Sequence, residues 1–217
     1  MIELVIFDMD GVLVDSEPAI TYASMEALSE IGVKAEYEDF KPFTGMGDDK
    51  FIEGVAKKYG REYDVKLKDR AYEIYIEKND RVKVFDSSKK LIEALTGQGL
   101  KCAVASASDL IKVKTNLSRI GVDVSIFTAI VTGSDVKNKK PDPEIFLKAA
   151  DFCKMPSEKA IVVEDAVSGV QAAKSAGMKC IAVTTSFDKT TLLSAGADYV
   201  IDELYDVFDI VGNLSKF

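Results

Sequence analysis

Three aspartates lie at the end of an apolar run near the start of the chain. The segment IFDMDGVLVDSE, residues 6–17, contains Asp8, Asp10 and Asp15, and the run LVIF comes immediately before Asp8. Carboxylates are costly to bury unless a cation or hydrogen bonds compensate their charge. We therefore expect a bound cation or an active site where this run ends.

The composition limits the chemistry that this site can perform. The chain contains no histidine, which excludes Ser-His-Asp and Cys-His hydrolysis, phosphohistidine chemistry and histidine-ligated zinc within it. Proton transfer must then come from carboxylates, lysine, tyrosine or cysteine.

Short apolar runs predict the elements that position these groups. Runs of this kind, apolar at every position, are typical of strands buried on both faces of a parallel sheet. They alternate with helical patterns, and this alternation predicts an α/β fold with a doubly wound parallel sheet. The expected strands are 4–7, 102–105, 129–131, 160–163, 180–183 and 199–201, and the expected core helices are 88–97, 111–120, 143–152 and 167–176.

A long interval separates the first two strands. One crossover needs only about a dozen residues, whereas nearly a hundred lie between residues 7 and 102. Apolar residues recur at helical spacing over 20–31, 51–59 and 67–74. We predict a small helical domain at 16–83, inserted into a Rossmann-like core formed by 1–15 and 84–217.

Polar residues follow four of the predicted strands. In open α/β sheets, ligands bind at the carboxyl ends of the strands, so we expect these residues to form one cluster. They are Asp8 and Asp10, then Ser106 and Ser108, then Thr132, Ser134, Asp135, Lys139 and Lys140, and finally Glu164 and Asp165.

Four ordered motifs carry a family resemblance: DMDGVLVD at 8–15, SAS at 106–108, KKPDPEIF at 139–146 and VVEDAVSGVQAAKSAG at 162–177. Together with the helical insertion after the first, they resemble the haloacid dehalogenase superfamily, in particular its phosphatases and β-phosphoglucomutase-like proteins with a helical cap. The resemblance implies a Mg²⁺-dependent phosphatase that hydrolyses a small phosphorylated metabolite, such as a sugar phosphate, through an aspartyl-phosphate intermediate.

The resemblance also assigns roles to particular residues. It makes Asp8 the nucleophile and Asp10 the general acid and then the general base, while Ser106 and Lys140 bind the phosphoryl group. Mg²⁺ is held by the carboxylates of Asp8 and Asp165 and by the backbone carbonyl of Asp10. Glu164 is either a further metal ligand through water or the residue that orients Lys140.

Several neighbouring residues have plainer interpretations. Asp15 and Glu17 either orient the hinge to the insertion or cap the first helix together with Ser16, and capping is the favoured interpretation. Capping of the helix that begins near Asp109 is an interpretation that suits Ser108 better than Ser106. Lys137 and Lys139 are expected to be surface charges, and Cys102 and Cys180, which lie within apolar runs, are expected to fill the core.

Substrate contacts are expected in the cap loop KPFTGMGDD, residues 41–49. Thr44, Gly45 and Lys50 are the candidates, together with Lys78. An ordinary turn with surface lysines is the alternative for Lys50 and Lys78.

A sugar phosphomutase of the β-phosphoglucomutase type is the alternative function. Such mutases place a histidine in the first cap helix and an arginine in the cap loop, where this chain has Ile20 and Gly47-Asp48-Asp49. The phosphatase is therefore favoured. Asp10 and the Glu164-Asp165 pair argue against a dehalogenase, and the inserted cap argues against a receiver-like phospho-acceptor module.

The remaining expectations concern partners and location. A net charge of −8 argues against nucleic-acid binding, and three cysteines without CxxC spacing suit a reducing cytosol. No run approaches the roughly 20 apolar residues of a membrane span. We expect a cytoplasmic monomer or weak dimer that binds a small phosphorylated metabolite.

Overall fold

The structure is a computed structural model and describes residues 1–43 and 47–215. Within these residues, six parallel strands form one sheet in the order β5-β4-β1-β6-β7-β8. The expected doubly wound α/β fold is thereby confirmed. The strands are β1 (Leu4–Phe7), β4 (Lys101–Ala105), β5 (Ala129–Val131), β6 (Ala160–Glu164), β7 (Lys179–Val183) and β8 (Tyr199–Ile201).

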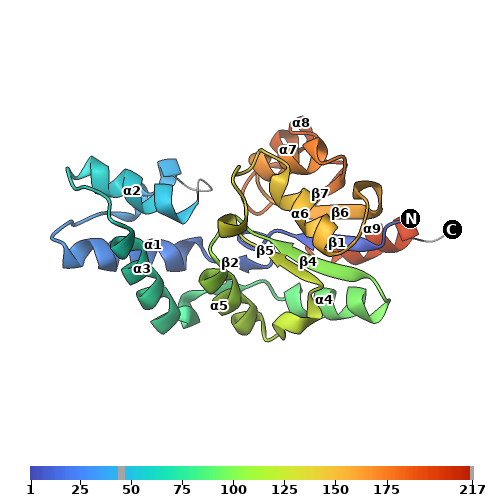
Figure 1. Cartoon of the computed structure of the whole chain (residues 1–217), viewed down its shortest axis with the longest axis horizontal. Coiled ribbons are helices and arrows are strands. Elements are labelled where there is room, and N and C mark those ends of the chain that lie inside the picture. The colour runs from blue at the N-terminus through green and yellow to red at the C-terminus, as the bar shows by residue number, and fades with distance from the viewer. Residues whose placement is uncertain (44–46, 216–217) are drawn as a thin grey trace.

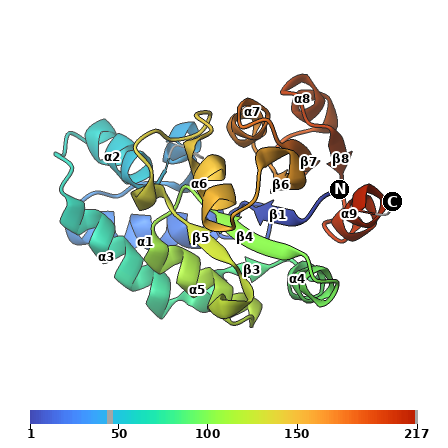
Figure 2. The ribbon, with the colours of Figure 1, turned by 45° about the vertical axis from the view of Figure 1, so that its right-hand side comes forward.

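Helices cover both faces of this sheet, which explains why the strands are apolar except at a few of their ends (Figures 1 and 2). Val5 and Phe7 of β1 pack on the side of α4 (Ser88–Gly97), α5 (Leu110–Ile120) and α9 (Asp206–Ser215). Leu4 and Ile6 face the opposite side. There they pack with α6 (Glu144–Phe152), α7 (Val167–Ser175) and α8 (Lys189–Ser194).

A separate group of helices follows the first strand (left in Figure 1). It contains α1 (Glu17–Glu30), α2 (Asp48–Lys58) and α3 (Val65–Glu77). The short strands β2 (Val14–Asp15) and β3 (Lys83–Val84) pair antiparallel on either side of this group. The chain thus leaves and re-enters the core through a two-stranded ribbon, and we call residues 17–81 between these strands the helical insertion.

The helical insertion has its own apolar contacts. Helix α1 packs along α3, and Ile20, Ala23 and Ala27 of α1 are buried. The rings of Phe40 and Phe51 lie 4.8 Å apart and attach the start of α2 to the segment before it.

Short 3-10 helices lie in several of the connections between these elements. They are η1 (Tyr37–Asp39), η2 (Lys41–Phe43), η3 (Asn79–Arg81), η4 (Val124–Ile126), η5 (Gly133–Asp135) and η6 (Ser157–Lys159). Gly177 follows α7 with a φ of +73°, the left-handed conformation expected of a helix-terminating glycine. In the part of the chain that is described, no helix combines the length and apolar character needed to cross a membrane.

Candidate active site

The site begins with a lysine held between two carboxylates. Asp8 follows β1, Glu164 ends β6, and these two strands are neighbours in the sheet. Lys140, from the loop between β5 and α6, places its Nζ 2.5 Å from Asp8 Oδ1 and 2.5 Å from Glu164 Oε1. All three side chains are at least nine-tenths buried. Burial disfavours the charged form of Lys140, but the negative charges of Asp8 and Glu164 stabilise its ammonium group more strongly. The pKa of Lys140 is therefore raised.

Glu164 is fixed on its other side by the backbone. Its Oε2 accepts hydrogen bonds from the amides of Asp165 and Ala166, each 2.9 Å long. A Cβ on Gly169, in the first turn of α7, would lie 1.8 Å from Glu164 Oε1. The carboxylate therefore occupies space that only a glycine leaves open.

Asp165 lies beside this group under a tight turn. Its Oδ2 accepts a hydrogen bond from the Ser186 hydroxyl, and a Cβ on Gly11 would lie 2.0 Å from the same oxygen. Burial, followed by the charges of Glu164 and Asp8, raises the pKa of Asp165 well above its usual value.

Asp8 shares this surplus of negative charge. Burial raises the pKa of Asp8 to about 7; Glu164 and Asp10 add to the rise, while Lys140 opposes it. A cation between Asp8 and Asp165 would offset this repulsion, and their oxygens suit Mg²⁺ or another hard divalent ion.

The expected set of metal ligands is small. Within residues 1–43 and 47–215, no three His, Cys, Asp or Glu side chains form a metal-binding cluster. The expected set needs only two carboxylates, Asp8 and Asp165, and the backbone carbonyl of Asp10. Mg²⁺ commonly keeps several waters in such sites, so the residues present fit this ion.

The Asp10 carboxylate is surrounded by hydrogen-bond donors. Oδ1 accepts from the Ser16 hydroxyl, and Oδ2 lies 2.8 Å from Ser108 Oγ and 3.4 Å from Ser106 Oγ. Burial opposes ionisation of Asp10, but Lys112 and the two serines Ser16 and Ser108 outweigh it, so the pKa of Asp10 lies below its usual value.

Two capping predictions are therefore wrong. Ser16 occupies the N-cap position of α1, yet its side chain makes no capping bond and turns to Asp10. Ser108 likewise bonds Asp10, and Asp109 is the residue at the N-cap of α5. In both cases the hydroxyl is oriented to donate to the Asp10 carboxylate, and hydrogen bonds to an ionised acceptor are stronger than those between neutral groups.

Not all strand-end residues join the cluster. Ser106 is fully buried after β4 and accepts a 3.2 Å bond from the Ser108 amide. Thr132 and Asp135, in contrast, bond each other and close their own turn, and Ser134 donates to Asp109. The expectation that one cluster contains all of them is wrong for Thr132, Ser134 and Asp135, whereas Lys140 from the same loop does join it.

The lysine and cap-loop predictions have mixed outcomes. Lys137 and Lys139 are exposed as expected, although Lys139 Nζ also donates to the Gly133 carbonyl over 2.6 Å. Lys50, in the first turn of α2, and Lys78, after α3, are exposed as well. Thr44 and Gly45 lie outside the described residues.

Sequence reasoning missed two polar residues of α5 beside Asp10. Lys112 Nζ lies 3.5 Å from Asp10 Oδ1, and Asn116 Nδ2 lies 3.4 Å from the same oxygen. A signal was present, because Lys112 and Asn116 adjoin the buried Val113 and Leu117 in the helical pattern. A polar pair four residues apart beside the buried stripe of a helix indicates a polar partner in the core.

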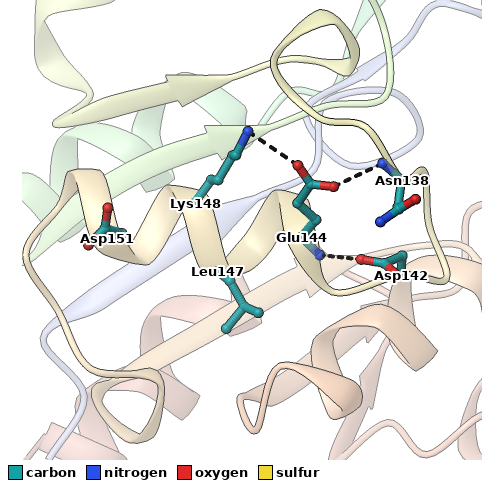
Figure 3. Close-up of a pocket in the computed structure, with 6 residues that line it drawn as sticks. All are labelled: Asn138, Asp142, Glu144, Leu147, Lys148 and Asp151. Carbon is teal, nitrogen blue, oxygen red and sulfur yellow. Dashed lines mark hydrogen bonds and ion pairs between the residues drawn. The ribbon is translucent and has the colours of Figure 1, made fainter.

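A surface hollow elsewhere is distinct from this site. It lies along α6, where Figure 3 draws the residues that line it. Its volume is about 440 Å³. Its lining residues are Asn138, Asp142, Glu144, Leu147, Lys148 and Asp151. Glu144 is already satisfied there by the amides of Lys137 and Asn138 and by Lys148. The hollow is wide open and none of the strand-end carboxylates lines it.

Comparisons with known proteins show which family the chain resembles. A model of the family described as haloacid dehalogenase-like hydrolase matches residues 5–183. The chain is 39% identical over 211 residues to the chloroplastic protein SUPPRESSOR OF QUENCHING 1 of Arabidopsis thaliana; the match covers 95% of this chain but only 20% of that protein.

Two further matches extend over nearly all of both chains. The phosphorylated carbohydrates phosphatase of Thermotoga maritima is 33% identical over 210 residues, which are 90% of this chain and 92% of that protein. The solved structure of a putative beta-phosphoglucomutase from the same organism has a TM-score of 0.79 and 28% identity, and the match covers 98% of this chain and all of that one.

Proposed function

Because the chain belongs to the haloacid dehalogenase-like hydrolase family, we propose that it is a Mg²⁺-dependent phosphatase that hydrolyses a small phosphorylated metabolite. A sugar phosphate is the favoured substrate class, as the name of the Thermotoga relative suggests. The observation that carries the proposal is Lys140, buried between Asp8 and Glu164 beside Asp165.

Asp8 is the proposed nucleophile. Lys140 binds Asp8 Oδ1, which leaves Oδ2 to attack phosphorus. The bond between phosphorus and the ester oxygen breaks as the aspartyl phosphate forms, so one difficult hydrolysis becomes two easier steps. Lys140 and the Ser106 hydroxyl bind phosphoryl oxygens and stabilise the charge that develops on them.

Asp10 is the proposed proton carrier in both steps. In its protonated form it gives a proton to the departing ester oxygen. The resulting carboxylate then takes a proton from the water that attacks the aspartyl phosphate, which restores the acid for the next turnover. Phosphate leaves and Asp8 is regenerated as a carboxylate. Mg²⁺, held by Asp8, Asp165 and the Asp10 carbonyl, would offset the repulsion between the Asp8 carboxylate and the phosphate ester. Glu164 orients Lys140.

The helical insertion forms nearly all of the proposed cap, whose limits are 16–83, and the proposed core is formed by 1–15 and 84–217. Its helices contact the core beside Asp10, since Tyr75 of α3 bonds Asn116 of α5. A cap in this place would exclude water and contact the leaving group. Thr44, Gly45 and Lys50 are the proposed substrate contacts.

The phosphomutase alternative has less support. Ile20 is buried in α1 where such mutases have a histidine, and the chain contains no histidine. The chain's location in the cytoplasm, its monomeric or weakly dimeric state and the absence of nucleic-acid partners stay predictions.

The first test measures phosphate release from a panel of phosphorylated metabolites, including hexose phosphates, with Mg²⁺ and with a chelator. We expect release to need both the metal and Asp8, so that Asp8→Ala is inactive. Asp151→Ala, which changes an exposed carboxylate of α6, is the matched control and should be fully active. Asp8-dependent interconversion of hexose phosphates without phosphate release would replace the phosphatase with the mutase.

A further inference from the structure

Lys112 and Asn116 of α5 are polar residues in a fully packed region. They are 4% and 0% exposed. Their spacing of four residues places both side chains on the same face of the helix, one turn apart. This face lies between the Asp10 carboxylate and the helical insertion.

Lys112 contacts one carboxylate on each side. Its Nζ lies 3.5 Å from Oδ1 of Asp10 in the core and 3.4 Å from Oδ1 of Asp48, the first residue of α2. The Asp48 side chain is only 10% exposed. The lysine is thus the cation between the proposed proton carrier and the insertion.

Asn116 repeats this arrangement without a charge. Its Nδ2 lies 3.4 Å from Asp10 Oδ1, and its Oδ1 accepts a 2.6 Å hydrogen bond from the hydroxyl of Tyr75 in α3. The two residues therefore reach the same oxygen of Asp10, and each is held from behind by a different helix of the insertion.

Further contacts attach the same surfaces to each other. Tyr72 of α3 places its hydroxyl 2.7 Å from Asp48 Oδ2 and 3.1 Å from Asp109 Oδ2. Lys68 pairs with Asp49 and Asp109, each over 2.9 Å. Since these contacts already attach the insertion to the core, attachment alone does not require a buried lysine beside Asp10. A buried ion pair is weak evidence for stability, because apolar residues often replace it without loss.

We propose that Lys112 and Asn116 are positioning residues that fix the Asp10 carboxylate when the cap is seated, with Asp48 and Tyr75 holding them in place. This rests on the proposed function, in which Asp10 transfers protons and the helical insertion is the cap. Movement of the cap away from the core separates Asp48 and Tyr75 from α5 and leaves Lys112 and Asn116 free to reorient. Proton transfer to the leaving group is thereby coupled to cap closure.

The test compares two substrates that differ in their need for a general acid. The alkoxide of an alkyl phosphate needs a proton as it leaves. The leaving group of p-nitrophenyl phosphate is the stable p-nitrophenolate, which needs little help from a general acid. The measured quantity is the ratio of kcat/KM for the best alkyl phosphate of the panel to that for p-nitrophenyl phosphate. The variants are K112M, N116A and D48N, with K114M as the matched control because Lys114 is an exposed lysine of the same helix.

We expect K112M to lower this ratio at least about tenfold, through kcat, which is part of the roughly 10²–10⁴-fold that general acids supply. N116A and D48N should lower it in the same direction by less, and K114M should leave it unchanged. K112M leaves Asp10 and Asp48 without their cation, so the double variant K112M/D48N, which removes the cap carboxylate as well, serves if K112M does not fold.

Three results would contradict the proposal in different ways. If K112M lowered kcat/KM equally for both substrates, Lys112 would have only a structural role. A lowered ratio in K112M with an unchanged ratio in D48N would remove the coupling to the cap. A wild-type protein without Asp8-dependent phosphate release would overturn the proposed function itself, and the positioning role with it.

Discussion

At the scale of single residues, the site is a problem of charge balance. Asp8, Glu164 and Asp165 are buried close together, and Lys140 is the cation that the structure places between two of them. Burial and mutual repulsion raise the pKa of both Asp8 and Asp165. The arrangement leaves an excess of negative charge at the place where a phosphatase would bind its metal.

Replacement of Lys140 tests this balance. Lys140→Met leaves Asp8 and Glu164 as facing buried carboxylates, so we expect a loss of about 3 kcal/mol or more in the free energy of unfolding and at least roughly a hundredfold loss of kcat. Urea unfolding and steady-state kinetics measure the two effects. Lys137→Met, at an exposed position of the same loop, is the control, and equal behaviour of both variants would refute the role of Lys140.

At the scale of elements, backbone placement decides which side chains fit. Helix α7 starts directly after the strand-end pair of β6, and its first turn would clash with Glu164 if it carried a side chain at Gly169. The glycine is in an ordinary helical conformation there, so close approach, not a positive φ, is the reason for it.

Gly169→Ala should therefore be harmful although alanine favours helices. Glu164 must move from its place beside Lys140, and we expect a loss of about 1–3 kcal/mol in unfolding free energy together with reduced kcat. Gly212→Ala in α9, where a Cβ meets nothing within 4 Å, should instead gain up to about 1 kcal/mol. Thermal unfolding of both variants checks the contrast. A stabilised Gly169→Ala would show that Glu164 can move aside for a methyl group without cost.

The insertion carries a pH-sensitive contact of its own. Asp39 of η1 accepts bonds from Lys58, from the Glu36 amide and from the Tyr59 hydroxyl. The Lys58 bond, followed by those from Glu36 and Tyr59, lowers the pKa of Asp39 to about 2 from an ordinary 3.8. These bonds attach α2 to the segment that follows α1.

The stabilisation by Asp39 should depend on pH with a defined sign. A lowered pKa in the folded state stabilises fully above pH 3.8, and the contribution is lost as pH falls towards 2. We expect Asp39→Asn to destabilise the protein at pH 6 and to have a much smaller effect at pH 2.5, as measured by urea unfolding at both values. An equal cost at the two pH values would mean that packing, and not ionisation, makes Asp39 useful.

At the scale of the whole molecule, the sheet order assembles the site. Asp8 and Lys140 are 132 residues apart in the chain, yet they meet because β1 lies between β4 and β6 and all strand ends face the same edge. The insertion leaves the core right after β1, so its helices return over that edge beside Asp10.

Metal binding should stabilise the whole chain. Because Mg²⁺ relieves the repulsion between Asp8 and Asp165 only in the folded state, we expect it to raise the free energy of unfolding by about 2.7 kcal/mol at a hundredfold excess over Kd. Thermal unfolding with Mg²⁺ and with chelator measures this shift. Asp165→Asn should lose the shift and Asp151→Asn should keep it; retention of the shift in Asp165→Asn would place the metal elsewhere.

The sequence alone determined the fold class and most element positions. A strand that is apolar along its whole length must be buried on both faces, and helical patterns between such strands are compatible with few topologies. The predicted strands 129–131 and 199–201 and the predicted helix 88–97 agree with the structure to the residue. The ribbon of β2 and β3 was not predicted, because a strand of two residues is too short to show an alternation of apolar and polar side chains.

Tertiary structure alone decided the partners of the polar side chains. Ser16 and Ser108 have local sequences typical of helix caps, but a buried carboxylate from another segment captures both hydroxyls. Lys112 and Asn116 lie about a hundred residues from Asp10, and only the packing of α5 against β1 and the insertion brings them together. Local patterns record the preferences of a segment, whereas competition for a buried charge is settled by whichever donors the fold places within reach.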